Sequence, residues 1–158
     1  MQETFSQSDY DVRDGMDGVI CVIDYENMKL QVAAANNPLY ILTQPNLNTD
    51  ISQNSWQFNQ ISPDKQPIGR FNGQVNPFTL KETAIQKGEM IYLLTDGFAD
   101  QFGGPKGKKF KYKQLQELLI SIANAPIKEQ KLALSSALTN WKGNLDQVDD
   151  ILIIGIRI

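Results

Sequence analysis

Carboxylates flank two strongly apolar segments of this 158-residue chain, and they are the side chains best placed to do chemistry. Thr95-Asp96-Gly97 directly follows the segment MIYLL, and Asp149-Asp150 directly precedes ILIIGI. Carboxylate oxygens are preferred ligands of hard divalent cations, which need several oxygens held on a rigid frame. The pattern predicts a magnesium or manganese site, which two such ions could share. The alternative is structural, because Asp-Gly is a common turn signal and acidic residues often flank strands as solvated groups.

The pairing of the two apolar segments decides whether these carboxylates meet. If the segments are antiparallel neighbours, the end of one lies beside the beginning of the other, and both acidic motifs converge at one sheet edge. Adjacent strand residues point to opposite faces, so only one of Asp149 and Asp150 would share a site with Asp96. Gly97 would let the backbone turn sharply beside that aspartate.

Histidine is absent from the sequence, which excludes a serine-histidine-aspartate triad, a cysteine-histidine pair and the usual zinc sites within this chain. Catalysis here would therefore have to use oxygen chemistry. Cys21 is the single cysteine, so it forms no internal disulfide, and its apolar surroundings predict a buried, inert thiol in a reducing compartment.

Length and composition indicate one globular domain with its own hydrophobic core. The chain is 41% apolar and 21% charged with a net charge of −3, which does not suggest nucleic-acid binding. Its opening is too polar for a signal peptide, so we expect a cytoplasmic location. Residues 1–17 are expected to form a polar lead-in and residues 18–158 a single domain.

The elements that must position the carboxylates follow from hydrophobic periodicity. β-Branched, continuous apolar runs predict strands covered on both faces at 18–25, at 90–95 and at the C-terminus, and Pro38 breaks the chain between two strands. We expect hairpins between 18–25 and 29–35 and between 77–85 and 90–95. The other expected elements are strands at 39–43, 56–61 and 149–158 and helices within 112–123 and 128–141. The arrangement is α+β with a mostly antiparallel sheet.

Four segments of the chain carry a family resemblance. In order, they are DGMDGVICVIDYENMKLQVAAANNPLYIL, KQPIG, TDGFADQFGGPKGKKFKYKQLQELL and QVDDILIIGIRI. From about Arg13 to Ile158, the chain resembles the C-terminal part of a bacterial PPM-type serine/threonine phosphatase of the stage II sporulation protein E subgroup. The resemblance implies a β-sandwich flanked by helices, with aspartate-bound metal ions at one end. A metal-bridging water would then attack the phosphorus of a phosphoserine or phosphothreonine, without a histidine nucleophile.

By position in the family motifs, Asp96 and Asp149 would be metal ligands for Mg or Mn, and Asp150 matches a neighbour that is Asp or Asn. Leu152 departs from the Thr or Ser that many members have there. Five lysines between Lys106 and Lys113 predict either a basic loop that attracts an acidic phosphoprotein or simply a solvated loop. The further candidates for supporting the ligands or contacting substrate are Gly97, Asp100, Asp150, Asn36, Asn37, Lys106, Lys108 and Lys109.

A larger departure concerns the family's first strands. They supply further metal aspartates, one of them in an Asp-x-x-Gly-His-Gly motif that this sequence lacks. Asp14-Gly15-Met16-Asp17 is interpreted as a turn rather than as a replacement. We therefore expect an N-terminally truncated domain that is catalytically silent by itself and binds metal weakly at best. The alternative is a non-catalytic interaction or signalling-output module with a degenerate phosphatase fold.

The resemblance also implies partners. The substrate would be a phosphoserine or phosphothreonine protein, commonly an anti-sigma-factor antagonist, in bacterial signalling. Sensor domains would precede the phosphatase in the parent chain and could tether it to a membrane. No nucleic-acid partner is expected, since the lysine-rich loop has no accompanying basic patch. Loss of early strands would expose a sheet edge, which favours a homodimer or strand exchange.

Overall fold

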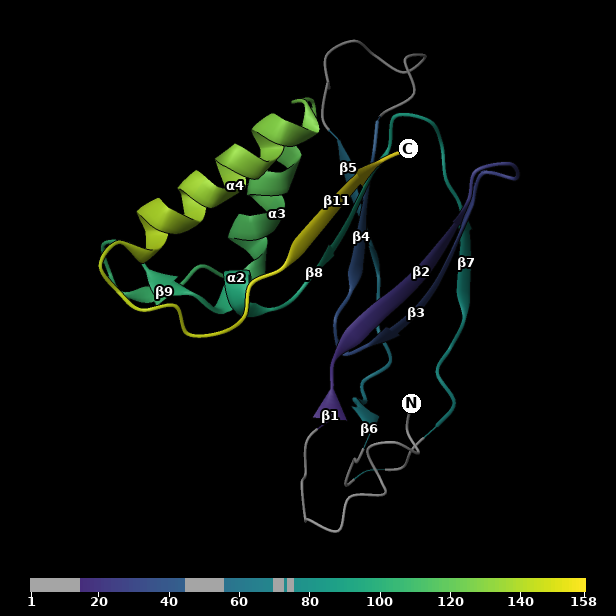
Figure 1. Ribbon diagram of the computed structural model, residues 1–158, viewed down its shortest axis with the longest axis horizontal. Coiled ribbons are helices and arrows are strands. Elements are labelled where there is room, and N and C mark those ends of the chain that lie inside the picture. Colours follow the sequence, from purple (N-terminus) through teal and green to yellow (C-terminus); the bar gives the residue numbers. More distant parts are fainter. Residues whose placement is uncertain (1–14, 45–55, 70–72, 74–75) are drawn as a thin grey trace. The chain divides into compact units, whose positions relative to one another are not determined.

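The computed structural model describes residues 15–44, 56–69, 73 and 76–158, and it has two compact units (Figure 1). Unit 1 comprises Met1–Leu39 and Gln60–Ile85, and unit 2 comprises Tyr40–Asn59 and Gln86–Ile158. Each unit has sheets of its own. No helix in the described part of the chain is long and apolar enough to cross a lipid bilayer.

Unit 1 is built on a three-stranded sheet with the order β2-β3-β7. Its strands are β2 at Gly18–Asp24, β3 at Lys29–Ala35 and β7 at Lys81–Ala84, and a separate ribbon pairs β1 at Gly15–Met16 with β6 at Ile68–Gly69. β2 and β3 form the predicted antiparallel hairpin. Its turn is closed by Asp24 Oδ1, which accepts the backbone N–H groups of Glu26 at 3.0 Å and Asn27 at 2.9 Å.

Three predictions for unit 1 are wrong. β2 is not covered on both faces, since Ile20 is 59% and Val22 55% exposed. Successive side chains of a strand point to opposite faces of its sheet, and the face that carries Ile20 and Val22 is open to solvent. β2 also lies at the edge of its sheet. Cys21 on this strand is accordingly only half-buried. Gly15 and Met16 form a strand rather than part of a turn, because β6 offers them an antiparallel partner, while Asp14 lies outside the described residues.

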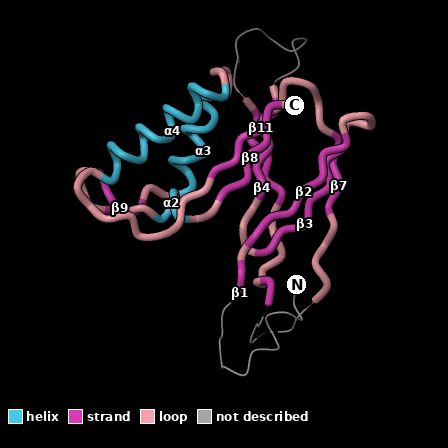
Figure 2. Tube along the Cα trace, in the orientation of Figure 1, coloured by secondary structure: helices cyan, strands magenta, loops and turns pink. Residues whose placement is uncertain are grey.

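Unit 2 is a four-stranded sheet with the order β11-β8-β4-β5, covered on one side by two helices (Figure 2). Met90, Tyr92 and Leu94 on β8 pack against Leu115 and Leu119 on α3 in the main hydrophobic core. The elements are β4 at Leu39–Thr43, β5 at Gln57–Ile61, β8 at Met90–Leu94, α2 at Gly97–Asp100, β9 at Phe102–Gly103, β10 at Lys108–Lys109, α3 at Tyr112–Ile122, α4 at Ile127–Lys142 and β11 at Ile153–Arg157.

The predicted hairpin between 77–85 and 90–95 is wrong. β7 pairs with β3, whereas β8 pairs with β11. β8 is buried on both faces and lies inside its sheet with a neighbour on each side, while the sequence KETA on β7 alternates between partly covered and exposed residues. A continuous apolar strand takes the central place, and an alternating polar one takes an edge.

The two predicted helices are confirmed, and buried polar groups fix their junction. Gln130 is buried and donates through Nε2 to the carbonyl of Ala125 at 2.9 Å, while its Oε1 accepts the Tyr92 hydroxyl at 2.7 Å. Arg157 donates to the carbonyls of Ala123 at 2.7 Å and Ala125 at 2.9 Å. These contacts satisfy carbonyl groups that the end of α3 leaves without helical partners.

The final strand is shorter and less buried than predicted. β11 begins at Ile153, so Asp149 and Asp150 precede it in an irregular segment. Leu152 is 56% and Ile154 45% exposed, because β11 is an edge strand in the described sheet and only one of its faces packs against the helices. The fold class is nevertheless the predicted one, a mixed α/β architecture with mostly antiparallel sheets and a few helices.

Candidate metal site

The two acidic motifs meet at one edge of the unit 2 sheet. β8 and β11 are antiparallel neighbours, with Leu94 opposite Ile153 and Met90 opposite Arg157. The end of β8 therefore lies beside the beginning of β11, which is the pairing that the sequence required for convergence. Beyond the last paired residues, the chain continues into Thr95-Asp96-Gly97 on one side and back into Asp149-Asp150 on the other.

Thr95 joins these two segments beyond the end of the paired strands. Its Oγ1 donates to the carbonyl of Asp150 at 2.8 Å and accepts the backbone N–H of Leu152 at 3.0 Å. Its backbone N–H also donates to the carbonyl of Leu152 at 3.1 Å. A hydroxyl that donates and accepts at once holds both strand ends in register. No role for Thr95 was predicted from the sequence, although the hydroxyl in the Thr-Asp-Gly motif was a signal for one.

Gly97 is required by close packing rather than by an unusual backbone. Its φ is not among the positive values of this chain. A Cβ at this position would lie 2.4 Å from the carbonyl oxygen of Asp150 and 3.0 Å from Cγ1 of Ile151. No side chain fits at such distances, so the absence of one allows the segment that carries Asp149 to approach the loop that carries Asp96.

The Asp96 carboxylate is not used to build the local structure. Asp96 occupies the N-cap position of α2, but its backbone is helical and its side chain makes no capping hydrogen bond. The residue is half-buried, and its side chain has no ion pair or hydrogen bond with other described residues. Burial, and then the negative charges of Asp96 and Asp100, raise the pKa of the Tyr112 hydroxyl, which places that ring close to both carboxylates. No residue that the structure describes therefore occupies the Asp96 oxygens through an ion pair or a hydrogen bond.

Asp149 and Asp150 are both exposed. Asp149 Oδ1 accepts the backbone N–H of Asp150 at 2.7 Å, and the Asp149 carbonyl accepts Nε2 of Gln147 at 2.8 Å. Because both aspartates precede β11, strand alternation does not separate them as the sequence analysis assumed. Asp150 contacts Thr95 through its backbone, so the structure assigns its carbonyl a structural role.

Gln101 is a fully buried polar residue that sequence reasoning missed. Its side-chain Nε2 donates to the carbonyl of Asp146 at 2.9 Å, and its Oε1 accepts the N–H of Val148 at 3.4 Å. Its backbone carbonyl accepts the N–H of Phe110 at 2.9 Å and Nε1 of Trp141 at 3.0 Å. One residue thus positions the segment leading to Asp149. No local periodicity marks a glutamine as buried, so the sequence carries little signal for it.

Asp100 lies at the C-terminal end of α2, next to the lysines, whereas Asp96 lies at its N-terminal end. Asp100 ends that helix and forms an ion pair with Lys109, whose Nζ lies 2.8 Å from its Oδ2. The pair is partly exposed and contributes at most about 1 kcal/mol. Lys106 and Lys108 are exposed. Asp100 is therefore engaged with a lysine, whereas Asp96 has no ion pair within the part of the chain that the structure describes.

Asn36 and Asn37 belong to unit 1, and their contacts are those of a turn. Asn36 has a φ of 57°, in the left-handed region that asparagine tolerates, and its Nδ2 donates to Asp17 Oδ1 at 2.7 Å. The backbone N–H of Asn36 donates to the carbonyl of Asp64 at 3.0 Å, and the backbone N–H of Asn37 donates to the carbonyl of Ala35 at 2.6 Å. These contacts give Asn36 a structural role through both its side chain and its backbone, and Asn37 a structural role through its backbone N–H.

Asp96 and Asp149 have the type of donor atom that a hard cation prefers, because both offer carboxylate oxygens. Among the described residues, however, no group of three or more histidine, cysteine, aspartate or glutamate side chains is arranged to hold a metal ion. Magnesium takes six oxygens and keeps several waters when one or two carboxylates bind it. These two residues would therefore supply only some of the six oxygen ligands of a magnesium ion.

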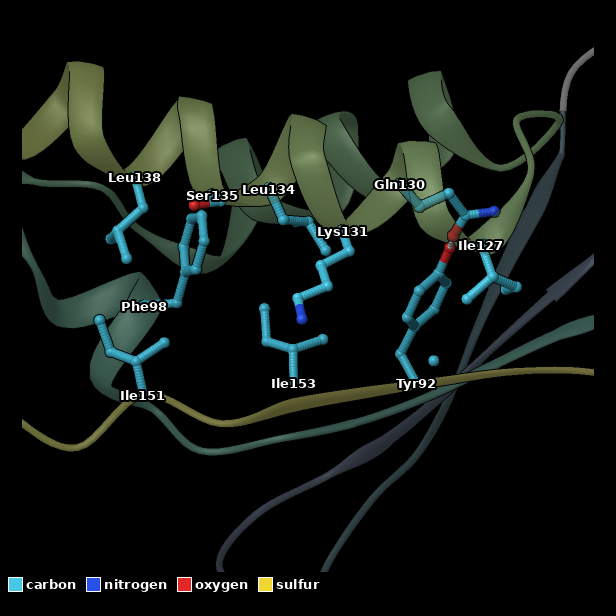
Figure 3. Close-up of a pocket in the computed structure, with 11 residues that line it drawn as sticks. Tyr92, Phe98, Ile127, Gln130, Lys131, Leu134, Ser135, Leu138, Ile151 and Ile153 are labelled. Atoms are coloured by element: carbon cyan, nitrogen blue, oxygen red, sulfur yellow. Dashed lines mark hydrogen bonds between the residues drawn. The ribbon is translucent and has the colours of Figure 1, made fainter.

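A cavity of about 440 Å³ lies between α4 and the β8 and β11 strands (Figure 3). Apolar side chains dominate its walls, among them Phe98, Leu134 and Ile153, and Lys131 reaches into it from the helix. The Tyr92 hydroxyl and Gln130 meet at one end. Neither Asp96 nor Asp149 lines it, so the cavity is distinct from the acidic edge.

Solved structures with a similar fold define the class of protein. The SiaA-PP2C domain of Pseudomonas aeruginosa superposes with a TM-score of 0.75 and 27% identity over 90% of this chain and 51% of that one. The PP2C phosphatase domain of SpoIIE from Bacillus subtilis was solved with a fragment of its regulatory domain. It gives a TM-score of 0.60 and 14% identity over 87% of this chain and 36% of that one. The RsbU and RsbW domains of Rv1364c from Mycobacterium tuberculosis give a TM-score of 0.62 and 18% identity over 89% of this chain and 35% of that one. The fold is that of PP2C phosphatase domains.

The sequence itself shows the family. Residues 2–158 match Stage II sporulation protein E (SpoIIE), and the chain belongs to this family. The PPM-type resemblance seen in the sequence motifs is thereby confirmed. No curated protein matches the chain. The chain spans about half, or less, of the length of the solved chains described above.

Proposed function

We propose that this chain supplies part of the active site of a magnesium- or manganese-dependent protein serine/threonine phosphatase, with Asp96 and Asp149 as metal ligands. The observation that carries the proposal is the Thr95 hydroxyl, which holds the two acidic segments together at 2.8 and 3.0 Å in a chain with a PP2C-type fold. Manganese is a reasonable probe, because the phosphatase domain of SpoIIE from Bacillus subtilis was solved after presoaking with Mn.

The chain's own residues would prepare the site. A bound metal pair would acidify a water molecule and offset charge on the phosphoryl oxygens. Asp96 would offer its unpartnered carboxylate, and Asp149 would offer the oxygen not bonded to the N–H of Asp150. Thr95, Gly97 and Gln101 would hold these oxygens in place, because each restrains one of the two segments through the contacts described above.

We also propose that this polypeptide by itself does not hydrolyse phosphoproteins. A binuclear centre needs several carboxylates, and Asp96 and Asp149 alone would leave most metal positions to water. The further ligands would come from polypeptide that corresponds to the other half of the matched domains. The substrate would be a phosphoserine or phosphothreonine protein of a bacterial signalling system, such as an anti-sigma-factor antagonist, and sensor domains would precede the phosphatase in the same polypeptide.

A complementation experiment tests this proposal. The chain is fused behind the N-terminal half of the SiaA-PP2C domain, the relative with 27% identity, and assayed on a phosphoserine peptide with manganese. We expect hydrolysis by the fusion, its loss in Asp96→Asn, and none by the chain alone. Because a fusion can misfold, manganese binding to the chain alone is measured by electron paramagnetic resonance. Binding unchanged by both Asp96→Asn and Asp149→Asn would refute the ligand assignment.

A second candidate is a non-catalytic interaction module. It is favoured by the exposed apolar side chains on one face of the C-terminal segment, Leu152 and Ile154, since such groups often mark contact surfaces. The two functions differ in their metal dependence. An interaction module would bind its partner equally well in excess chelator, and its Asp96→Asn variant would bind like the wild type.

A further inference from the structure

Five lysines surround the β9–β10 hairpin of an otherwise acidic chain. Lys106 lies in its turn, Lys108 and Lys109 form β10, and Lys111 and Lys113 follow, all of them exposed. Lys109 is paired with Asp100, and the other four have no ion pair among the described residues. The full sequence has a net charge of −3, so this is a local concentration of positive charge.

The hairpin is held firmly on α4 through Trp141. The N–H of Gly104 donates to the Trp141 carbonyl at 2.8 Å, and the ring of Phe110 packs edge-on against the indole at 5.2 Å. A Cβ at Gly103 would lie 1.9 Å from the Trp141 carbonyl oxygen, and one at Gly104 would lie 2.6 Å from its ring. The lysines are therefore presented by a hairpin that is anchored to α4.

The same hairpin ties the lysines to the acidic edge. Asp96 and Asp100 lie at the two ends of α2, a single turn about 6 Å long. Asp100 binds Lys109 at 2.8 Å, and the N–H of Lys111 donates to the carbonyl of Ala99 at 2.7 Å. A positive surface thus begins one helical turn from the proposed ligand Asp96.

We propose that this hairpin is a docking surface for an acidic segment of the phosphoprotein substrate. The inference rests on the proposed function, since it assumes that substrate approaches the Asp96 edge. Fixed like charges attract an oppositely charged chain and raise its rate of association. An acidic peptide fits better than nucleic acid, because the chain is acidic as a whole and would repel a long polyanion that extends beyond the hairpin.

Fluorescence anisotropy tests the proposal with peptides of three kinds. One carries a phosphoserine among glutamates and aspartates, the second is the same peptide with plain serine, and the third carries the phosphoserine among neutral residues. The test variant is Lys106→Glu with Lys108→Glu, which spares the paired Lys109. The matched control is Lys87→Glu with Lys128→Glu, two exposed lysines of the same unit and the same change in net charge.

We expect both acidic peptides to bind the wild type at low salt and to bind the hairpin variant at least about tenfold more weakly, with the control within about twofold. Raising the ionic strength should remove the difference. Equal weakening by both variants, or equal binding of the neutral and acidic peptides by the wild type, would overturn the proposal. A single-stranded oligonucleotide that binds the hairpin more tightly than the acidic peptides would overturn it too.

The plain serine peptide separates this test from the phosphatase proposal. Its binding involves no phosphate and no metal, so it should persist in Asp96→Asn and in excess chelator. Loss of hydrolysis in the fusion with retained docking would refute the phosphatase proposal alone. Retained hydrolysis without hairpin-dependent docking would refute the docking surface alone.

Discussion

At the scale of single residues, the acidic edge depends more on contacts to the backbone than on the carboxylates themselves. Thr95 bonds both a carbonyl and an N–H of the facing segment, and Gly97 lets that segment come within reach. Asp96 remains without a structural partner among the described residues. An aspartate held by such neighbours can keep its carboxylate available to a ligand, because its position is already determined.

Gly97→Ala should destabilise unit 2 by about 1–3 kcal/mol, because its Cβ would overlap the backbone of Asp150 at 2.4 Å. Chemical denaturation followed by tryptophan fluorescence measures this change. Gly18→Ala is the control, since its Cβ would meet nothing closer than 3.9 Å, and it should change the free energy of unfolding by less than about 1 kcal/mol. Equal losses in the two variants would contradict the packing argument.

Thr95→Val keeps the shape of the side chain and removes both hydroxyl contacts with Asp150 and Leu152. We expect a loss of about 1 kcal/mol in stability and faster hydrogen exchange at the N–H of Leu152, which loses its acceptor. Thr139→Val on the exposed side of α4 serves as control. Unaltered exchange at Leu152 would show that Thr95 does not hold this segment.

At the scale of elements, sequence patterns predicted those strands and helices whose buried residues form a regular pattern within one segment. The helical periodicity of the segment with Leu115 and Leu119 and the continuous apolar run at 90–95 gave the correct elements. Pairing was harder, because β7 could not be assigned to β3 instead of β8 without knowing which strand lies inside a sheet. Likewise, the carboxylates of the candidate site were recognisable by type, whereas Gln101 depends on three distant segments that only the fold brings together.

Two buried tyrosines of unit 2, Tyr40 on β4 and Tyr92 on β8, should give stability a dependence on alkaline pH. Burial raises the pKa of Tyr92 to about 12, and that of Tyr40 to about 12. A tyrosine whose pKa is higher in the folded state favours folding only while it is protonated. Its stabilising effect is therefore complete below the unfolded pKa of about 10 and is lost as the pH rises towards 12.

Urea denaturation at neutral pH and at about pH 11 measures this dependence. We expect the free energy of unfolding to fall over that range in the wild type and to fall less in Tyr40→Phe. Tyr25→Phe, on an exposed turn tyrosine, should behave like the wild type. A decline of the same size in all three proteins would exclude Tyr40 as a cause.

Gln130→Met tests the junction between the two helices. The variant keeps the side-chain length but leaves the Tyr92 hydroxyl without its buried partner, while the Ala125 carbonyl keeps its hydrogen bond from Arg157. Leaving the buried hydroxyl unsatisfied should cost about 1–3 kcal/mol, seen as a lower midpoint of denaturation. Gln116→Met on α3 is the control, because no hydrogen bond of that side chain contributes to the junction. A loss below about 1 kcal/mol in Gln130→Met would contradict this role.

At the scale of the whole molecule, exposed apolar groups accompany an open sheet edge. β11 is the end strand of the described four-stranded sheet, and Leu152 and Ile154 are about half exposed beside it. Unpaired backbone groups and apolar side chains together favour pairing with another strand. The matched solved domains are about twice as long as this chain or longer, and their additional polypeptide could protect such an edge.

The chain should therefore self-associate at high concentration. Sedimentation equilibrium should show dimers or larger species, and Ile154→Lys should shift the distribution towards monomer by placing a charge on the open face. Leu132→Lys, at an exposed apolar position on α4, should leave the distribution unchanged. A monodisperse monomer at every concentration would refute the prediction.

The buried Gln101 has a consequence for how the two surfaces communicate. Its amide holds the segment before Asp149, and its backbone carbonyl holds Phe110 at the base of the lysine hairpin. One buried residue therefore restrains both surfaces at once. Any change that displaces Gln101 should move the acidic edge and the base of the lysine hairpin together.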